Sequence, residues 1–344
     1  MILLWGSPGD GSLGSVFRGL RAQGAPVAIL DPRALPSCEL AVRVAENVEG
    51  MLRLGPDELA LDDVTGVYIR ATSFRQFADV VPGGPACRAW QHAAAVEYLL
   101  GSWLEITPAR VVNRLSDMAP NCSKPFQGEQ LRALGFAIPD TLLTTDADAA
   151  RQFIARHRGR VIVKPISAMA SVVSRIDDGA MQRLGELDCC PVQLQEQVTG
   201  VDYRVHVVGD EVFTCRIISE ADDYRHPERQ GLTTQLVADE VPAELAERCR
   251  GLARRLRLPV TGIDLRRTPG GAWYCFEANP NPAFEYYERV TRQPIGDAIA
   301  RWLVRGAPAD RTARDERFEI AGARTIANLE AIRALGVQSS TRGK

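Results

Sequence analysis

Two runs of strand-forming residues on either side of a glycine pair constrain this chain more than any other feature. The runs are Val260–Leu265 and Ala272–Glu277, and the segment between them contains Pro269-Gly270-Gly271. A glycine pair between such runs predicts a β-hairpin. With the two glycines as the loop, the register of the strands places Asp264 directly opposite Glu277.

This register predicts a metal site. Directly opposed residues have Cβ atoms about 4.5–5.5 Å apart, where like charges repel. Asn279 lies two residues beyond Glu277 and returns to the same face of the strand. Two carboxylates and an amide oxygen on one face suit Mg²⁺, which takes oxygen ligands and shares them with phosphates. The alternative is a solvated face with two unrelated acids, but the run Asn279–Pro282, which stops the strand abruptly, favours the metal.

Length and composition limit the classes of protein to which this chain can belong. A chain of 344 residues is long for one domain, so we expect two or three lobes. The net charge of −2 gives no electrostatic argument for binding nucleic acid or an anionic membrane. Eight cysteines without a C-x-x-C pair favour reduced thiols over a disulfide framework or a zinc site. No run is long enough to span a bilayer, and no basic segment precedes the first apolar run, so we expect a cytoplasmic enzyme.

The first hundred residues open with a β-α-β pattern. Strands are expected at Ile2–Trp5 and Val27–Leu30, with a helix over Ser15–Gln23 between them. The connecting Gly9–Gly14 segment has the glycine spacing of a dinucleotide fingerprint, and Asp31 follows about 20 residues later. This leaves an NAD-type oxidoreductase as a rival. The adjoining proline and acid suit a pyrophosphate poorly, which favours a glycine-rich turn in a non-catalytic lobe.

The rest of the chain reads as a small α+β unit followed by a sheet-rich lobe. We expect domains at 1–108, 109–190 and 191–305, and then a polar linker and a C-terminal helix over 306–344. In the α+β unit, strands are expected at Thr141–Thr144, Arg160–Pro165 and Ser171–Arg175. In the lobe after it, they are expected at Pro191–Val198, Asp202–Val208 and Glu211–Ile218, followed by a helix over Ala243–Leu256, the hairpin, and a helix over Ile295–Leu303.

Charged residues precede the hairpin at positions suited to a nucleotide. Lys124 opens a helix and Lys164 closes a strand, and each is a point charge able to hold phosphate. The segment Gln195–Val198 offers backbone groups and a carboxylate to a base, and Asp202 offers a carboxylate to ribose hydroxyls. Two arginines, Arg216 and Arg225, add positive charge for a phosphoryl group or an acidic substrate.

In this order and spacing the chain resembles the ATP-grasp superfamily, specifically its RimK-like carboxylate–amine ligases. The resemblance covers about residues 109–303 and is carried by an ordered set of segments: Asn113 with Lys124, VIVKP at 161–165, QEQVTGVDYRVHVVGD at 195–210, DDYR at 222–225, GIDL at 262–265 and FEANPNP at 276–282. It implies a three-lobed fold of α/β and α+β type. The lobes are an N-terminal βαβ (pre-ATP-grasp) lobe, a small α+β lid and a C-terminal antiparallel-sheet lobe.

The resemblance also implies roles for individual residues. Lys124 and Lys164 would bind the ATP phosphates, and Asp202 would bind the ribose. Adenine would be held by Glu196 and by the backbone of Gln197 and Val198. Two Mg²⁺ ions, replaceable by Mn²⁺, would be held by Asp264, Glu277 and Asn279. The arginines Arg204, Arg216 and Arg225 would face the substrate carboxylate and the acyl phosphate.

The expected function is an ATP- and Mg²⁺-dependent carboxylate–amine ligase that forms an amide bond through an acyl phosphate, on an amino acid or a peptide. The segment after Lys164 reads ISAMASVV and has none of the glycines that many relatives place over the γ-phosphate. A glycine-poor lid also resembles the ligases that macrocyclise ribosomal peptides. Relatives commonly form dimers or tetramers, which implies a homo-oligomer. Besides the oxidoreductase, a non-catalytic nucleotide-binding protein stays open, because the lid glycines are missing.

Overall fold

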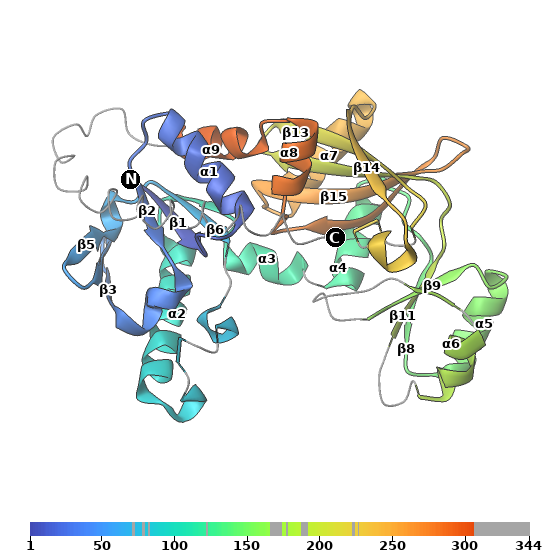
Figure 1. Cartoon of the computed structure of the whole chain (residues 1–344), viewed down its shortest axis with the longest axis horizontal. Coiled ribbons are helices and arrows are strands. Elements are labelled where there is room, and N and C mark those ends of the chain that lie inside the picture. Colours follow the sequence, from blue (N-terminus) through green and yellow to red (C-terminus); the bar gives the residue numbers. More distant parts are fainter. Residues whose placement is uncertain are drawn as a thin grey trace, which may run out of the picture. The chain divides into compact units, whose positions relative to one another are not determined.

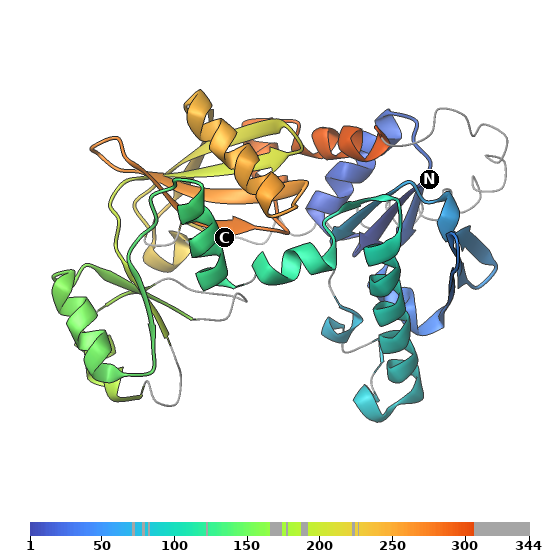
Figure 2. The same cartoon turned by 180° about the vertical axis from the view of Figure 1, so that it is seen from behind.

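The computed structural model describes residues 1–70, 73–77, 80–81, 83–121, 123–165, 174–176, 178–186, 192–221, 224–225 and 227–305. They form two compact units. The first contains the described residues within Met1–Ser116, Ala283–Glu285 and Pro294–Arg305, and the second contains those within Asp117–Pro282 and Tyr286–Gln293. The ISAMASVV segment and the linker and helix expected over 306–344 lie outside the described residues. Figures 1 and 2 show the chain from two opposite sides.

The first unit is built on a parallel sheet of order β2-β1-β6-β7. Its strands are β1 (Ile2–Gly6), β2 (Val27–Leu30), β6 (Gly66–Arg70) and β7 (Arg110–Val112). The predicted β-α-β opening is confirmed, with helix α1 (Gly11–Ala22) as the crossover. Helix α9 (Ile295–Val304) packs on α1, and a Cβ on Gly296 would lie only 2.1 Å from the Ser15 hydroxyl.

The same unit contains an antiparallel meander that the sequence patterns did not predict. Its strands are β3 (Cys38–Val44), β4 (Val48–Leu54) and β5 (Asp57–Ala60). Cys38, Leu52 and Leu59 from these strands are buried in one core with residues of the long helix α2 (Arg88–Ile106).

Both acids of the dinucleotide-like pattern, Asp10 and Asp31, have structural roles. Asp10 caps α1 by accepting a hydrogen bond from the Leu13 N–H at 2.8 Å, and it pairs with Arg70 at 2.9 Å. Asp31 accepts from the Arg33 N–H at 3.0 Å at the start of a short 3₁₀ helix. Both carboxylates satisfy groups of the chain itself, as expected for a structural turn.

A small antiparallel sheet opens the second unit, with order β10-β9-β11-β8. Its strands are β8 (Thr141–Thr144), β9 (Val161–Pro165), β10 (Ser174–Arg175) and β11 (Val192–Glu196). The predicted antiparallel pairing of the segment ending at Arg175 with β9 is confirmed for the described part, 174–175. The amphipathic helix α5 (Ala147–Arg156) buries Phe153 and Ile154 against Val161 and Leu194.

The larger sheet of this unit is antiparallel, with order β14-β13-β12-β15-β16. Its strands are β12 (Val201–Val208), β13 (Glu211–Ser219), β14 (Thr234–Asp239), β15 (Val260–Arg267) and β16 (Trp273–Asn279). One face packs on helix α7 (Ala243–Arg255) through alternate residues such as Tyr203, Val205 and Ile263. Figures 1 and 2 show α7 and the short helix α8 (Glu285–Thr291) on opposite faces. Strand β14 and helix α8 were not predicted.

Other short elements complete the described chain. The helices are α3 (Leu115–Asn121), α4 (Lys124–Ala133) and α6 (Asp178–Gln182), and the 3₁₀ turns are Pro32–Ser37, Leu61–Asp63, Phe74–Gln76, Gly84–Ala86, Arg183–Glu186 and Pro227–Gln230. None of the helices in the described ranges is long and apolar enough to cross a membrane.

The hairpin β15–β16 reaches the predicted register by a different route. Asp264 pairs with Glu277, as predicted. The turn, however, has three residues, because Thr268 bonds to Ala272 across it. A β-bulge at Phe276 adds one residue to β16 and restores the pairing beyond it. The prediction of a two-residue loop was wrong, while the opposition of the two acids is confirmed.

Candidate functional site

A row of charged side chains crosses the larger sheet on the face away from α7. Arg204 on β12 pairs with Asp264 on β15, and Asp264 pairs with Glu277 on β16. Directly opposed residues share a face, so the three side chains are neighbours. Arg204 is only 5% exposed, and its Nη1 lies 2.6 Å from Asp264 Oδ1.

The bulge places two consecutive residues of β16 on this face. Along a regular strand, side chains alternate between the two faces. Here Cys275 and Ala278 are both buried in the core beneath α7, while Phe276 and Glu277 line the cavity on the other face. The sequence patterns missed Phe276 because strict alternation assigns it to the core.

A cavity of about 250 Å³ lies over this face and is also bordered by the small sheet. It brings together nine of the twelve predicted site residues: Lys124, Lys164, Glu196, Gln197, Val198, Asp202, Arg225, Asp264 and Glu277. Residues to which the sequence analysis assigned no role also line it, among them Arg175, Arg266, Phe276, Ser219 and Tyr224. Of the other predicted residues, Arg204 lies beside the cavity through its contact with Asp264.

Two lysines face the acids across the cavity. Burial lowers the pKa of Lys164 to about 8, with the charge of Glu277 opposing the shift. Burial also lowers the pKa of Lys124, where Glu277 again opposes the shift and Arg225 adds to it. The Lys164 Nζ donates to Gln195 Oε1 at 2.9 Å and lies 5.6 Å from the centre of the Phe276 ring. These cations are held in a confined site and have room for anionic oxygens.

The acid pair has the chemistry of a cation site. Burial raises the pKa of Glu277, and the charge of Asp264 raises it further. Two buried carboxylates in contact repel each other unless a proton or a cation lies between them. Within the described ranges, no group of three or more His, Cys, Asp or Glu residues could hold a metal. A divalent ion would therefore need further oxygens from amide groups or from a bound phosphate.

Asn279 and Arg216 are not brought into the cavity. Asn279 lies on the face of Glu277, but its Oδ1 accepts from the Asn281 N–H at 2.8 Å. Arg216 is paired with Tyr203, which faces the α7 core, so Arg216 lies on the opposite face from Arg204. There its Nε is 3.3 Å from Asp239 Oδ2. We do not include Arg216 in the candidate site.

The segment after β11 presents backbone groups to the cavity. The Gln197 N–H donates to the Arg160 carbonyl at 3.0 Å, and the Val198 carbonyl accepts from Arg266 Nη1 at 2.7 Å. Glu196 is fixed at this end by a bond from the Asp140 N–H to its Oε2 at 3.2 Å.

Asp202 makes a two-pronged ion pair with Arg266. The Nε and Nη2 of Arg266 lie 2.7 and 2.8 Å from the two oxygens of Asp202. The Arg266 guanidinium also lies over Phe276, at 5.2 Å from the ring centre. The pairing of β12 with β15 places Arg266 directly opposite Asp202, so knowledge of that pairing could have identified the arginine.

The guanidinium of Arg204 packs directly against Gly262, in space that a side chain at that position would need. A Cβ on Gly262 would lie 2.1 Å from Arg204 Nη2 and 2.5 Å from its Cζ. The Arg204 Nε donates to His206 Nε2 at 3.4 Å. Burial and the charge of Arg204 hold the pKa of His206 well below its ordinary value, so the ring is a neutral acceptor.

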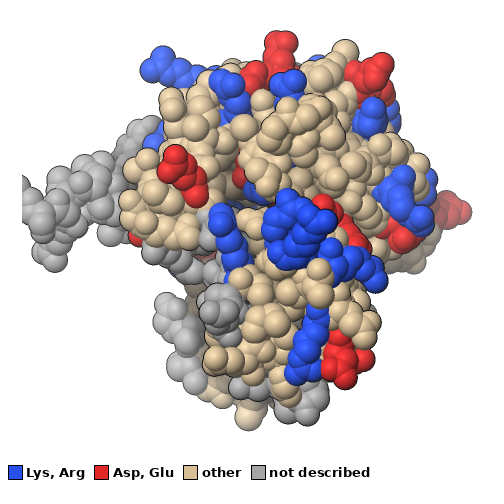
Figure 3. All heavy atoms as spheres, turned by 90° about the vertical axis from the view of Figure 1, so that its right-hand side faces the viewer, with Lys and Arg blue, Asp and Glu red and all other residues tan. Residues whose placement is uncertain are grey.

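Exposed arginines lie near the segment that joins the small sheet to the larger one. Arg158 and Arg160 between α5 and β9, and Arg267 near the hairpin turn, are exposed. Figure 3 shows Lys and Arg side chains gathered across the middle of one face, with Asp and Glu side chains beside and around them. The net charge of −2 therefore conceals a local excess of positive charge.

Comparisons with known proteins agree on the fold. No family model matches the chain. The macrocyclase MdnC of Microcystis aeruginosa MRC, solved with its precursor peptide MdnA, has a TM-score of 0.76 at 22% identity, covering 89% of this chain and 100% of that one. The ATP-grasp ligase PsnB, solved with a precursor variant, Mg and ADP, has a TM-score of 0.73 at 27% identity, covering 89% and 98%.

A curated relative matches part of the sequence. The ribosomal protein bS6–L-glutamate ligase of Escherichia fergusonii is 32% identical over 114 residues, which are 33% of this chain and 37% of the relative. The chain thus matches little more than a third of the length of that relative.

Proposed function

We propose that this chain, which belongs to the ATP-grasp ligases, uses ATP to activate a carboxylate of a peptide and joins it to an amine. The observation that carries the proposal is the acid pair Asp264–Glu277 in one cavity with Lys124, Lys164 and Arg225. Such a set neutralises phosphates and holds the cation that accompanies them.

The lining of the cavity suits a nucleotide. Lys124 and Lys164 would hold the phosphates. The Gln197 N–H and the Val198 carbonyl are already bonded within the chain, so adenine would use the Gln197 carbonyl and the Val198 N–H, with Glu196 beside them. Phe276 offers the base an apolar surface. Asp202 is held by Arg266 but keeps lone pairs able to accept from ribose hydroxyls.

The acid pair fits magnesium. Asp264 and Glu277 would hold Mg²⁺, two ions in the full site, with Mn²⁺ as an alternative. Asn279 Oδ1, which accepts from the Asn281 N–H, would contribute only through its second lone pair. When bound, the metal neutralises charge that builds up on the phosphates during transfer. The solved relative PsnB contains Mg and ADP. The repulsion between the two acids in the ligand-free chain is what a cation would remove.

The chemistry proceeds in two steps. A carboxylate oxygen of the substrate attacks the γ-phosphorus of ATP, the bond to the β-γ bridging oxygen breaks, and ADP leaves. The amine then attacks the acyl carbon, loses a proton and expels phosphate, which leaves an amide. Arg225, which lines the cavity, would bind the carboxylate, and Arg204 holds Asp264 in place for the metal.

A peptide is the favoured substrate. Both solved relatives were captured with precursor peptides, and the exposed arginines near the small sheet suit a chain rich in carboxylates. An amino-acid acceptor is the second candidate, favoured by the match to the bS6 glutamate ligase.

An assay with purified protein separates these possibilities. The chain is incubated with ATP, Mg²⁺ and peptides that carry both acidic and lysine residues, or with free glutamate in their place. We expect ADP release that depends on the peptide, together with the loss of one water per bond formed, detected by mass spectrometry. ATP binding without substrate-stimulated ADP release would instead favour a non-catalytic nucleotide-binding protein.

The position of the nucleotide gives a second prediction. Lys164→Met should weaken ATP binding about 10–100-fold, because a hydrogen bond to a charged group contributes about 1.5–3 kcal/mol. Gly11→Ala should leave ATP affinity unchanged while lowering the melting temperature, because its Cβ would lie 2.9 Å from Glu285 Cγ. Calorimetric titration measures the ATP affinity of both variants, and thermal unfolding measures their melting temperatures. The opposite result, with Gly11→Ala losing the nucleotide and Lys164→Met silent, would support the oxidoreductase alternative.

A further inference from the structure

A pair of tyrosine hydroxyls lies beside the acids and has no part in the nucleotide and metal sites described above. Tyr224 lies between β13 and β14 and lines the cavity, and Tyr287 lies on α8. Their hydroxyl oxygens are 3.3 Å apart. Tyr287 is 9% exposed. The groups assigned above to the phosphates, the metal and the substrate carboxylate are mainly acids, lysines and arginines, so this pair of phenol hydroxyls is a distinct kind of group at the cavity wall.

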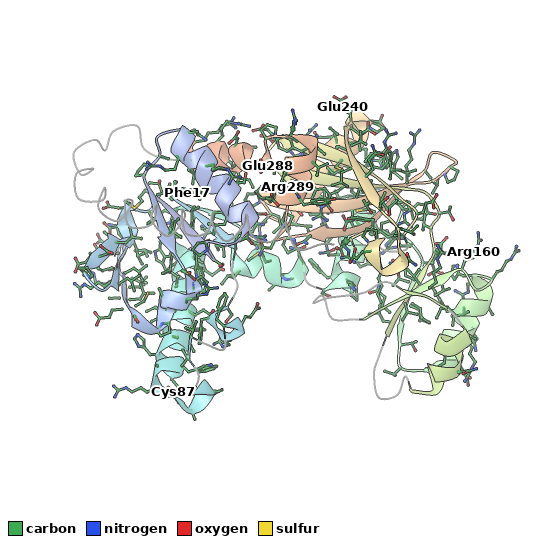
Figure 4. The ribbon with its side chains drawn as sticks, viewed as in Figure 1. Phe17, Cys87, Arg160, Glu240, Glu288 and Arg289 are labelled. Atoms are coloured by element: carbon green, nitrogen blue, oxygen red, sulfur yellow. The ribbon has the colours of Figure 1, made fainter. Side chains whose placement is uncertain are left out.

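Both tyrosines are fixed from several sides. The backbone carbonyl of Tyr224 accepts from Thr234 Oγ1 at 2.9 Å, which ties the loop to β14. The Tyr287 ring meets His206 edge to face, with centroids 5.1 Å apart, and lies 5.8 Å from the Arg204 guanidinium carbon. In Figure 4 the labels Glu288 and Arg289 mark the helix that carries Tyr287. The hydroxyl pair is therefore anchored to the same row of residues as the acids.

The pair keeps a proton to donate. Burial raises the pKa of both tyrosines, and the charge of Asp264 also acts in that direction. Both are therefore neutral at ordinary pH. Two hydroxyls carry two protons, and the bond between them uses one. A buried donor left without an acceptor is unfavourable, so an anionic oxygen entering the cavity is a fitting partner for the second O–H.

We propose that the Tyr224 hydroxyl donates a hydrogen bond to one oxygen of the substrate carboxylate, and that Tyr287 is the positioning residue that holds it there. This inference rests on the proposed function. One carboxylate oxygen attacks the phosphorus, and the other becomes the carbonyl oxygen of the acyl phosphate. When the amine attacks, that second oxygen takes up negative charge, and it returns to a carbonyl as phosphate leaves. A fixed donor at this oxygen lowers the barrier without transferring its own proton.

Hydroxyl deletions test the inference in the full chain. Tyr224→Phe and Tyr287→Phe keep both rings, and Tyr286→Phe is the matched control, because Tyr286 adjoins Tyr287 but is 46% exposed. The readouts are ATP affinity in the presence of Mg²⁺, melting temperature, and kcat/KM for the acidic, lysine-containing peptide. Removing a single transition-state donor costs about 10²–10³-fold in rate in well-formed sites. For Tyr224→Phe we expect a fall in kcat/KM of about tenfold or more, with ATP affinity unchanged.

The double variant distinguishes a cooperating pair from two independent residues. Tyr287→Phe should act in the same direction, and Tyr224→Phe/Tyr287→Phe should be no worse than Tyr224→Phe alone, because the positioning effect requires the Tyr224 hydroxyl. Wild-type kinetics in Tyr224→Phe, additive losses in the double variant, or a parallel loss of ATP and Mg²⁺ affinity would each overturn the inference. A wild-type chain that binds ATP but releases no ADP with any peptide overturns the proposed function and this inference with it.

Discussion

Glu277→Gln should abolish ligation while making the ligand-free protein more stable. The carboxamide keeps the shape of the side chain but removes the charge that would hold Mg²⁺. We expect a fall in peptide-dependent ADP release of roughly 10²–10³-fold, the scale of losing a fixed electrostatic contact to the transition state. The gain in stability follows from the pKa of Glu277, which burial and the charge of Asp264 raise in the folded chain.

The size of this gain depends on pH. A carboxyl group with a raised pKa in the folded state binds protons more tightly there than in the unfolded chain. It therefore disfavours folding once the pH rises through the raised pKa. The melting temperature of Glu277→Gln should exceed that of the wild type at neutral pH, and the difference should shrink in acid.

A surface control separates this effect from a general loss of negative charge. Glu240, labelled in Figure 4, is exposed at the end of β14. Glu240→Gln should change neither the activity nor the melting temperature. Adding Mg²⁺ and ATP should raise the melting temperature of the wild type more than that of Glu277→Gln. A Glu277→Gln protein that keeps full Mg²⁺-dependent activity would remove this residue from the proposed metal site.

Gly262→Ala should be strongly destabilising for the addition of a single methyl group. The new Cβ would lie 2.1 Å from Arg204 Nη2, so the guanidinium must leave its position against Asp264. Breaking a buried ion pair costs about 3–5 kcal/mol, because a charge stays buried without its partner. We expect a loss of this size in the free energy of unfolding, together with loss of ligation.

Gly251→Ala is the matched control. Gly251 lies within helix α7 and has nothing within 4 Å of an added Cβ. Alanine in a helix interior is favoured over glycine by about 0.5–1 kcal/mol, so this change should be neutral or stabilising. Denaturant unfolding monitored by circular dichroism compares the two variants. Equal stabilities would mean that Arg204 can move aside without cost.

Local patterns predicted the elements that carry the site. The apolar run before Lys164, the helix that begins at Lys124 and the hairpin with its opposed acids follow from periodicity and turn residues. The prediction that Arg216 belongs to the site did not use the register of β12 and β13, which the sequence also indicates. A two-residue turn at Gly209-Asp210 pairs Arg216 with Tyr203, on the face away from Arg204.

Other features depend on contacts between segments far apart in the chain. Arg266 became part of the site only through the pairing of β15 with β12, which no local pattern reports. The same holds for Tyr287, because a seven-residue helix after a proline-rich stretch shows little periodicity.

The meander of β3, β4 and β5, in contrast, could have been predicted from local patterns, since Cys38–Val44 and Val48–Leu54 contain alternating apolar residues.

The bulge at Phe276 has a consequence for how this hairpin can vary. Twelve residues separate Asp264 from Glu277, and that spacing alone keeps the acids opposed. The spacing can be met by a three-residue turn with a bulge, as here, or by a two-residue turn with none. The second arrangement would direct Cys275 into the cavity and Phe276 into the core. Turn length thus selects whether an aromatic ring or a thiol borders the cavity, without moving either acid of the pair.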